Sequence, residues 1–208
     1  MHSYFSNKTQ PYSTADYPIF VAEVASTLNE ILLFFDQYQK ATDDNIKLYL
    51  LMEFLDGMKG TLFRQTQFAE FELEMHKIAE KGGQLTGDVL SSLYKKIVRK
   101  YYGHEMGVCF VPDYIKYEWA YVPHFYYNYY VYQYATSFTA SISLSKDILE
   151  GNQESIKRYI NFLSSGGSDY PINLLKKAGV DMTSDEPFNK TMEFMDWAMD
   201  ELGKIINQ

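Results

Sequence analysis

Apolar residues recur every three or four positions along most of the chain, the period of an α-helix that is buried on one face. The first such stripe begins after Pro18 and continues to about Gln39. Its apolar members are Phe20, Val24, Leu28, Ile31 and Phe35. Further stripes predict helices at about 44–57, 60–81, 88–103 and 123–148, one within 151–170, a short one from 171, and a last one over 188–206. No pair of strands is recognisable, so the pattern predicts a mainly α helical bundle in a single domain over residues 1–208.

Capping residues indicate where several of these helices begin. The run Thr42-Asp43-Asp44 and the residue Asp88 are suited to cap two amino termini, because short polar side chains accept hydrogen bonds from free helix amides. Pro123 is expected to open the long helix that runs to Ile148, since proline fits the first helical turn. The last helix carries an apolar seam that we expect to face the core. Its members are Phe188, Met192, Met195, Met199, Leu202 and Ile206.

Composition and charge narrow the class of protein. The 208 residues carry a net charge of −8, which argues against a nucleic-acid or anionic-membrane partner because both require a basic face. Cys109 is the single cysteine, a usage that fits a reducing compartment and predicts a cytoplasmic location. The chain has no apolar stretch of the ~18 residues that a membrane span requires. Its amino terminus also lacks the pattern of a signal peptide.

Two carboxylates on the first helix are candidate functional groups. Glu23 stands among apolar neighbours, where an ionised carboxylate requires a partner. Glu30 follows seven residues later and therefore shares the same helix face. The simpler interpretation is a solvated stripe, which we favour for Glu30, whereas Glu23 is the better candidate for a buried and partnered acid. A carboxylate that reaches inward from a helix is a common third ligand of zinc, although it cannot form a zinc site by itself.

The segment HEMGV, which begins at His104, invites comparison with the His-Glu-x-x-His motif of zinc peptidases. The comparison fails because the fifth residue is Val108, and Gly103 and Gly107 oppose a long helix through the segment. We therefore expect His104 to be structural or exposed, and we expect the same of His76.

The stretch 117–138, YEWAYVPHFYYNYYVYQYATSF, is unusually rich in tyrosine. Most of its rings are expected to fill core and interface space, with their hydroxyl groups bonded to carbonyls. In a helix that begins at Pro123, Tyr129 and Tyr132 would lie on one face, and His124 would lie a little more than one turn upstream. Phenols and an imidazole in this arrangement can hold an oxyanion.

Several separated motifs together resemble a known family. They are FVAEVASTLNE, FRQTQFAEFE, YYGHEMG, YVPHFYYNYYVYQYATS, SGGSDYPINLLKKAGVDMTSDEPF and the final helix. In this order they are similar to the carboxy-terminal part of oligoendopeptidase F, in the thimet-oligopeptidase class of zinc metallopeptidases. The resemblance covers essentially all of the chain. It implies a mostly helical, cytosolic peptidase that cleaves short peptides inside a deep channel.

The resemblance also implies a zinc site. In the family, zinc is held by the two histidines of a His-Glu-x-Gly-His motif and by a glutamate on the next helix. Glu23 matches that glutamate, and Glu30 matches a second acid seven residues later. His2 resembles a third histidine, three residues after the second histidine of the motif. Glu30 and His2 would support the metal site without binding the zinc.

On the substrate side, three residues match family positions that bind the substrate backbone and stabilise the tetrahedral intermediate. These are His124, Tyr129 and Tyr132. The resemblance implies that Tyr132 and His124 are catalytic and that Tyr129 and His124 contact the substrate.

The chain departs from the family pattern at its start. Met1 aligns two residues after the second histidine of the zinc motif, so two zinc ligands and the general-base glutamate are absent from these residues. One hypothesis is therefore a carboxy-terminal fragment of the peptidase that binds no zinc and is inactive alone. The other is a stand-alone, truncated module that keeps a tyrosine-lined groove for peptides. We also expect self-association, because the face that would meet the missing segment, including Phe20, Val24 and the Tyr129 side, would be uncovered.

Overall fold

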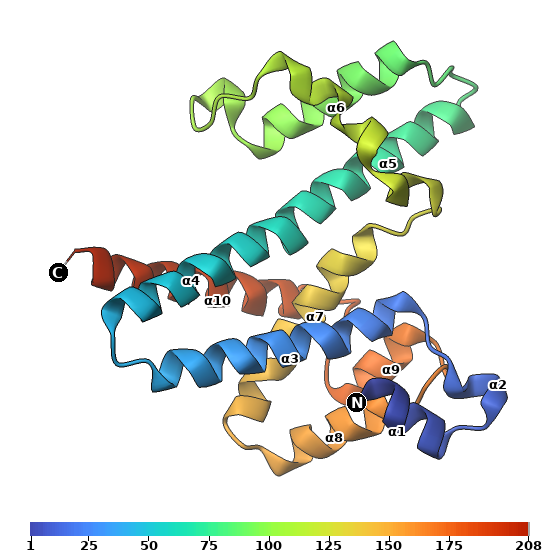
Figure 1. Ribbon diagram of the computed structural model, residues 1–208. Helices are drawn as coiled ribbons and strands as arrows, with labels where there is room; N and C mark the ends of the chain where they lie inside the picture. The colour runs from blue at the N-terminus through green and yellow to red at the C-terminus, as the bar shows by residue number, and fades with distance from the viewer. Residues whose placement is uncertain (208) are drawn as a thin grey trace. The chain divides into compact units, whose positions relative to one another are not determined.

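The computed structural model describes residues 1–207, and over that range it contains helices and no strand, which confirms the predicted mainly α fold (Figure 1). The chain divides into two compact units, Met1–Lys59 together with Thr136–Gln208, and Gly60–Ala135. Within the described residues, no helix combines the length and the apolarity needed to cross a bilayer. The assignment of residues 1–208 to one domain stays a prediction.

The first unit consists of helices from both ends of the chain. They are α1 (His2–Thr9), α2 (Tyr12–Ala15), α3 (Ile19–Lys40), α4 (Asp44–Met58), most of α7 (Tyr132–Leu149), α8 (Gln153–Leu163), α9 (Pro171–Ala178) and α10 (Glu186–Ile206). The cap predicted within Thr42-Asp43-Asp44 is confirmed and is Asp43, whose carboxylate accepts a hydrogen bond from the Asn45 amide at 2.8 Å.

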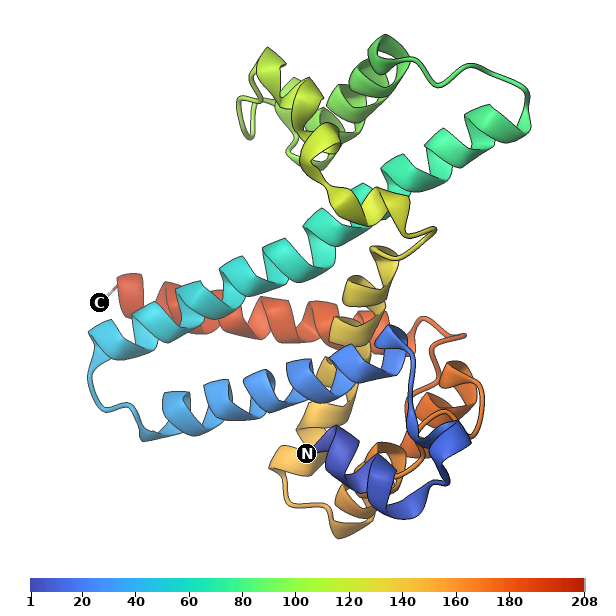
Figure 2. The same cartoon turned by 45° about the vertical axis from the view of Figure 1, so that its right-hand side comes forward.

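The amino-terminal half of α3 forms the centre of this unit. Its predicted stripe is confirmed, because Phe20, Val24 and Leu28 are buried in one cluster with residues of α7, α8 and α9. Figures 1 and 2 both show α7 crossing α3. The small residues Ser137 and Ser141 of α7 are buried at this crossing, where their hydroxyls bond directly to α3 carbonyls.

The carboxy-terminal half of α3 packs against α4 and α10 through aromatic rings. The Phe35 ring lies 5.2 Å from that of Phe194 and 5.5 Å from that of Trp197, and Phe54 contacts Phe194 at 5.1 Å. The predicted apolar seam of α10 is therefore mostly not the buried face, although its member Leu202 packs against this cluster. Its members Phe188, Met192, Met199 and Ile206 are exposed, whereas Thr191 and Ala198 are buried. A different face of α10 is turned toward the core, because the rings of Phe194 and Trp197 fill the space beside α3 and α4.

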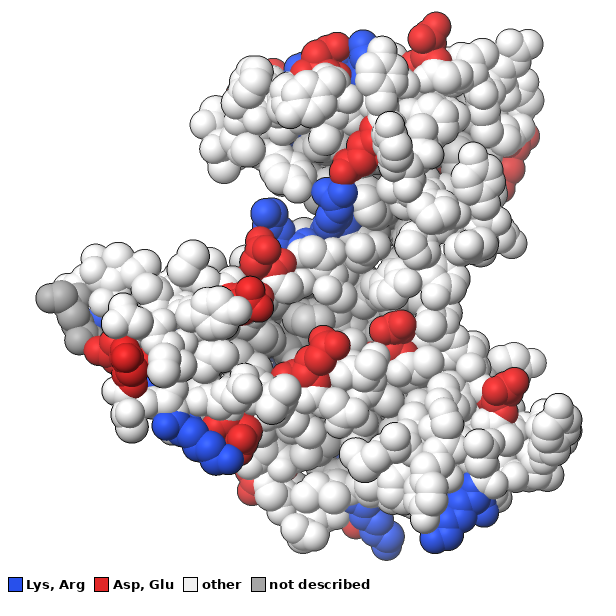
Figure 3. Space-filling model, in the orientation of Figure 1, with Lys and Arg blue, Asp and Glu red and all other residues white. Residues whose placement is uncertain are grey.

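Exposed apolar residues in the first unit lie on other helices than expected. Phe20 and Val24, which we expected to be uncovered, are 8% and 0% exposed because α7 to α9 cover them. By contrast, Tyr49 on α4 is 62% exposed and lines a groove of about 550 Å³ with Met52 and Leu202. Figure 3 shows that charged residues are scattered and leave wide areas without charge on the face it presents.

The second unit contains α5 (Arg64–Glu80), α6 (Gly87–Tyr101) and three short 3-10 helices. The latter are η2 (His104–Met106), η3 (Asp113–Tyr121) and η4 (Pro123–Tyr126). The expected break near Gly57 is absent: α4 continues to Met58 and is followed by a π-helical segment, η1 (Lys59–Phe63). The core of the unit forms between α5 and α6, where Phe71 and Tyr94 are fully buried.

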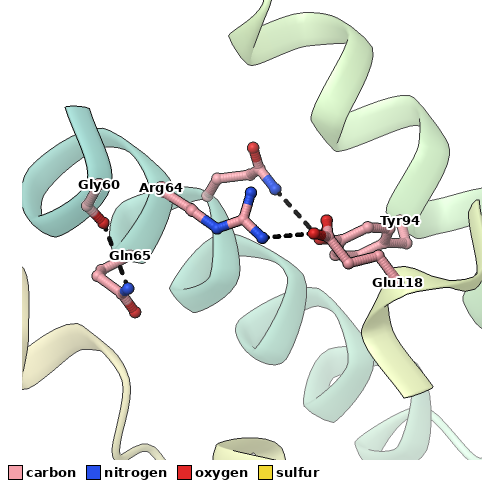
Figure 4. A network of polar contacts seen from close by, with 6 residues as sticks. Gly60, Arg64, Gln65, Tyr94 and Glu118 are labelled. Carbon is pink, nitrogen blue, oxygen red and sulfur yellow. Dashed lines mark hydrogen bonds and ion pairs between the residues drawn. The ribbon is translucent and has the colours of Figure 1, made fainter. Parts of the chain in front are cut away.

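A polar network joins three elements of the second unit (Figure 4). The Glu118 carboxylate of η3 pairs with the Arg64 guanidinium of α5 and accepts a hydrogen bond from the Tyr94 hydroxyl of α6. Burial, together with the Glu118 carboxylate, raises the pKa of the Tyr94 phenol. The phenol therefore stays neutral, and the network fixes η3 against both helices.

Two predicted helix starts in this part of the chain are wrong. The cap of α6 is Thr86, whose hydroxyl accepts from the Val89 amide at 3.3 Å, while Asp88 lies inside the first turn. The long helix does not begin at Pro123, which opens only the short η4, and α7 begins at Tyr132. The chain between them contains two residues of positive φ, and a right-handed helix cannot accommodate them.

Candidate functional site

Glu23 lies in the first part of α3, between buried residues on both sides. Its side chain is half-buried, and Oε2 accepts a hydrogen bond from the Ser26 hydroxyl at 3.2 Å. Among the described residues, Glu23 forms no ion pair with a Lys, Arg or His side chain. The carboxylate is therefore held locally and still has an oxygen available to a further partner. Glu30, seven residues later, is exposed.

The backbone around Glu23 is anchored by α7. The Ser137 hydroxyl donates to the Phe20 carbonyl at 2.9 Å, and the Ser141 hydroxyl donates to the Val24 carbonyl at 2.9 Å. Both hydroxyls are buried, where an unmade hydrogen bond costs more than a made one contributes. These bonds fix the α3 backbone on either side of Glu23, so the position of its carboxylate is set by the packing of α3 on α7.

His2 occupies the start of α1 and is enclosed by aromatic rings. Its ring stacks on Tyr17 with centroids 3.6 Å apart, and Phe162 lies 5.9 Å away. Burial lowers the pKa of His2 to about 4, and the amino terminus adds to the effect. The imidazole is therefore neutral at pH 7, and its buried Nδ1 has no hydrogen-bond partner among the described residues.

The donor chemistry of this unit fits one ligand position of a zinc site. A catalytic zinc takes three protein ligands and a water molecule. In the described part of the chain, no group of three or more His, Cys, Asp or Glu side chains is arranged to hold a metal ion. Glu23 offers one carboxylate on a fixed helix face, which suits a single ligand that complements others.

His124 lies on η4 in the second unit, within a group of tyrosine rings. It stacks on Tyr130 with centroids 5.5 Å apart and meets Tyr127 and Tyr134 edge-on, each at 6.0 Å. The sequence placed His124 near the start of a helix with Tyr129 and Tyr132. The structure instead surrounds it with three other tyrosines of the same run, because the chain turns between η4 and α7.

The turn is made by Asn128 and Tyr129, whose φ angles are 51° and 58°. Asn is among the residues that tolerate this left-handed region, whereas a bulky side chain such as tyrosine rarely adopts it. The Tyr129 amide donates to Glu72 Oε1 at 2.7 Å, and the Tyr129 ring stacks on His76 with centroids 4.4 Å apart. Tyr132 is the first residue of α7 and is partly exposed. Tyr129 and Tyr132 therefore do not share a helical face, contrary to expectation.

Sequence reasoning missed one residue that contacts this turn, Glu72 of α5. His76 was expected to be structural or exposed, and its stacking on Tyr129 gives it the structural role. A usable signal was present in Asn128, since an asparagine within a run of tyrosines favours a left-handed turn over a continuous helix. His104 has a structural role, because its Nδ1 accepts the Val111 amide at 2.9 Å.

The predicted site residues fall into two sets, one in each unit. Glu23, Glu30 and His2 belong to the first, and His124, Tyr129 and Tyr132 belong to the second. The structure supports one potential metal ligand in the first set and a cluster of aromatic hydrogen-bond donors in the second.

Two solved structures have a similar fold. The fold is similar to oligoendopeptidase-F from Enterococcus faecium, with a TM-score of 0.85 and 42% identity, over 99% of this chain and 37% of the other. It is also similar to a putative peptidase from Chlamydophila abortus, with a TM-score of 0.88 and 44% identity, over 98% of this chain and 34% of the other. The helical arrangement therefore defines an oligoendopeptidase-type fold.

Sequence comparisons agree with this class. The model of Peptidase family M3 matches residues 1–194, and the chain belongs to that family. It is 46% identical to oligopeptidase PepF of Bacillus subtilis, over 99% of this chain and 30% of the relative. It is 45% identical to Group B oligopeptidase PepB of Streptococcus agalactiae, over 99% of this chain and 34% of the relative. The chain thus spans about a third of the length of these relatives.

Proposed function

We propose that this chain supplies one zinc ligand and the substrate-binding hydroxyl groups of an oligoendopeptidase that hydrolyses short peptides in the cytoplasm. Membership of Peptidase family M3 over residues 1–194 is the observation that carries this proposal. Residues 1–208 then form the carboxy-terminal part of one catalytic domain. The chain has no His-Glu-x-x-His motif, so the remaining ligands and the general base come from other sequence. By itself the chain binds no stoichiometric zinc and cleaves no peptide.

On the metal side, Glu23 would hold the zinc ion through its carboxylate. Bound zinc would polarise the scissile carbonyl and lower the pKa of a bound water molecule. The Ser26 hydroxyl orients the Glu23 carboxylate through Oε2, as partners of metal ligands commonly do. Glu30 contributes negative charge on the same helix, and His2 supplies a neutral imidazole near the start of the chain.

On the substrate side, the tyrosine cluster binds the peptide backbone. Tyr132 donates its hydroxyl proton in a hydrogen bond to the oxyanion that develops on the substrate carbonyl. His124 contributes to the same stabilisation and, with Tyr129, contacts the peptide backbone. The aromatic surroundings of His124 support this role, because they limit the positions that its imidazole can adopt.

A graft tests the proposal. The matching region of Bacillus subtilis PepF, 46% identical to this chain, is replaced by residues 1–208. The graft is expected to bind stoichiometric zinc and to cleave a quenched-fluorescence peptide. Glu23→Gln is expected to lose zinc, whereas the control Asp36→Asn, on an exposed position of α3, is expected to retain both properties. A Glu23→Gln graft with a full complement of zinc would contradict the assignment.

A second candidate function is a peptide-binding module that acts without metal. The exposed tyrosine rings of the second unit favour it, since tyrosine-rich surfaces suit peptides. The most exposed of these are Tyr121, Tyr126 and Tyr114. Titration of the isolated chain with short peptides, followed by tyrosine fluorescence, separates the two functions. Saturable binding without zinc would favour the module, and binding only in the graft would favour the peptidase.

A further inference from the structure

Glu72 is a buried carboxylate on α5 that the proposed chemistry does not use. It is 1% exposed and lies beside the fully buried Phe71. Among the described residues it forms no ion pair with lysine or arginine; its Oε1 accepts the backbone N–H of Tyr129 at 2.7 Å. His76 follows four residues later on the same face of α5 and stacks on the Tyr129 ring. One helix therefore holds both the backbone and the ring of a single residue in the turn.

The turn requires such a contact for two reasons. Tyr129 has a φ of 58°, which is uncommon for a bulky side chain and persists only where the surroundings impose it. The Tyr129 amide also lies between η4 and α7, outside either ladder of helical hydrogen bonds. The Glu72 carboxylate is buried, and a buried carboxylate is unfavourable without a partner. The bond between Glu72 and Tyr129 satisfies both groups.

Apolar contacts on each side of the turn fix the positions of its two ends, but they do not determine the backbone conformation between them. Phe125 packs on Phe68 and Phe71, with centroids 5.7 Å and 5.1 Å apart, and Val131 is fully buried. Apolar burial is not directional, so it does not select a left-handed turn between these anchors. A charged hydrogen bond has a preferred geometry and is roughly twice as strong as a neutral one. Glu72 is the residue in this contact set that can select the backbone conformation.

We propose that Glu72 is a positioning residue, which holds the turn over residues 127–130 in its left-handed conformation and so presents the tyrosines around His124 to a peptide substrate. The positioning of the turn follows from contacts within the second unit. The presentation to a peptide rests on the proposed function.

Hydrogen exchange of the Tyr129 amide, followed by NMR on the 208-residue chain, tests the positioning step. In Glu72→Ala the exchange rate is expected to rise at least about tenfold, because a hydrogen bond to a charged group is lost. Glu72→Gln keeps an oxygen acceptor of the same shape and is expected to restore part of the protection. The control Glu80→Ala removes an exposed carboxylate of the same helix and is expected to leave the rate unchanged.

The amide of Tyr94 in the core of the second unit distinguishes a local effect from general destabilisation. Its exchange is expected to stay unchanged in all three variants. Unchanged exchange at Tyr129 in Glu72→Ala, or an equal rise at Tyr94 and Tyr129, would overturn the inference. If Glu72→Ala does not fold, the near-isosteric Glu72→Gln is used to test the inference. The NMR signal of its Tyr129 amide proton should move upfield, because the charged acceptor is replaced by a neutral one.

A second measurement connects the turn to the substrate. In the PepF graft, Glu72→Ala is expected to lower kcat/KM at least about tenfold while zinc content stays the same, since misplaced donors lose transition-state stabilisation. Loss of exchange protection without a change in kcat/KM would overturn presentation to the peptide. The exchange measurement uses neither metal nor peptide, so failure of the proposed function does not affect its outcome.

Discussion

At the scale of single residues, Tyr132 is the first helical residue after the turn, and it is partly exposed. In the PepF graft, Tyr132→Phe is expected to lower kcat by about 10²-fold or more, roughly 3 kcal/mol, and to raise KM far less. The reason is that a phenol which donates to the oxyanion acts mainly in the transition state. Steady-state kinetics with a fluorogenic peptide measures both constants.

Tyr126→Phe is the matched control for Tyr132→Phe. Tyr126 belongs to the same tyrosine run and is strongly exposed on η4, so the loss of its hydroxyl should leave both constants near those of the parent. A kcat for Tyr132→Phe within about twofold of the parent, far below the expected effect, would transfer the oxyanion role to Tyr129 or His124.

The ionisation of Glu72 gives a residue-scale prediction for stability. Burial raises the pKa of Glu72 above its ordinary value of 4.5, while the Tyr129 amide and His76 act in the opposite direction. Folding therefore favours the protonated carboxyl group, and its contribution to stability is complete below the unfolded pKa. The contribution decreases as pH rises through the folded pKa, because the buried group must then carry charge.

Urea unfolding of the parent chain and of Glu72→Gln between pH 4 and pH 7 measures this effect. The free energy of unfolding of the parent is expected to fall, relative to that of Glu72→Gln, as pH rises from about 4.5. Glu80→Gln, which changes an exposed carboxylate, should follow the parent. A difference between parent and Glu72→Gln that rises with pH would show that the hydrogen bond to Tyr129 outweighs burial.

At the scale of elements, the start of α6 offers a comparison between the residue that caps the helix and an acidic residue inside its first turn. The Thr86 hydroxyl accepts the Val89 amide, and Asp88 lies two residues further along. Thr86→Ala is expected to lower the free energy of unfolding by about 1 kcal/mol, the usual effect of losing such a cap. Chemical unfolding at neutral pH measures the change.

Asp88→Asn is the comparison for Thr86→Ala. It removes only the favourable interaction of a negative charge with the amino terminus of the helix, which contributes about 0.3–1 kcal/mol at low ionic strength and less in salt. At high salt, the loss of stability in Thr86→Ala should persist, whereas the loss in Asp88→Asn should become smaller. A larger, salt-independent loss in Asp88→Asn would restore Asp88 as the cap.

At the scale of the whole molecule, we still expect self-association. The sequence indicated the face with Phe20 and Val24, but the structure buries both and exposes a different apolar surface. Apolar residues of α4 and α10 are exposed, among them Tyr49, Met52 and Ile206. An apolar patch of this kind is commonly covered by a partner, and two copies of one patch can be complementary. We expect light scattering across a dilution series to show a mass that rises above 24.3 kDa with concentration.

Met52→Glu is expected to shift this association toward the monomer, because it places a charge in the apolar groove. Ser92→Glu, at an exposed position of α6 in the second unit, is the control and should not change the association. A mass near 24.3 kDa at every concentration would contradict the prediction and would favour repulsion by the net charge of −8.

Local sequence determined most of the helices and the candidates for chemistry. The stripe from Phe20 to Ile31 predicted both α3 and its buried face, because helical periodicity is a property of neighbouring residues. The run Thr42-Asp43-Asp44 marked the start of α4, because a cap acts on the amides of the turn that directly follows it. The apolar flanks of Glu23 marked it as a candidate for a partnered acid, and the separated motifs indicated the peptidase family, which the comparisons confirm.

Tertiary contacts decided the features that depend on residues far apart in the chain. The turn at Tyr129 is held by Glu72, 57 residues earlier, so no local pattern could place the start of α7 at Tyr132. The buried face of α10 follows from the rings that Phe194 and Trp197 present to Phe35, although the apolar seam of that helix pointed elsewhere. Periodicity identifies a helix, but its buried face and the conformation of its connecting turn are set by which distant side chains fill the space and satisfy the free amides.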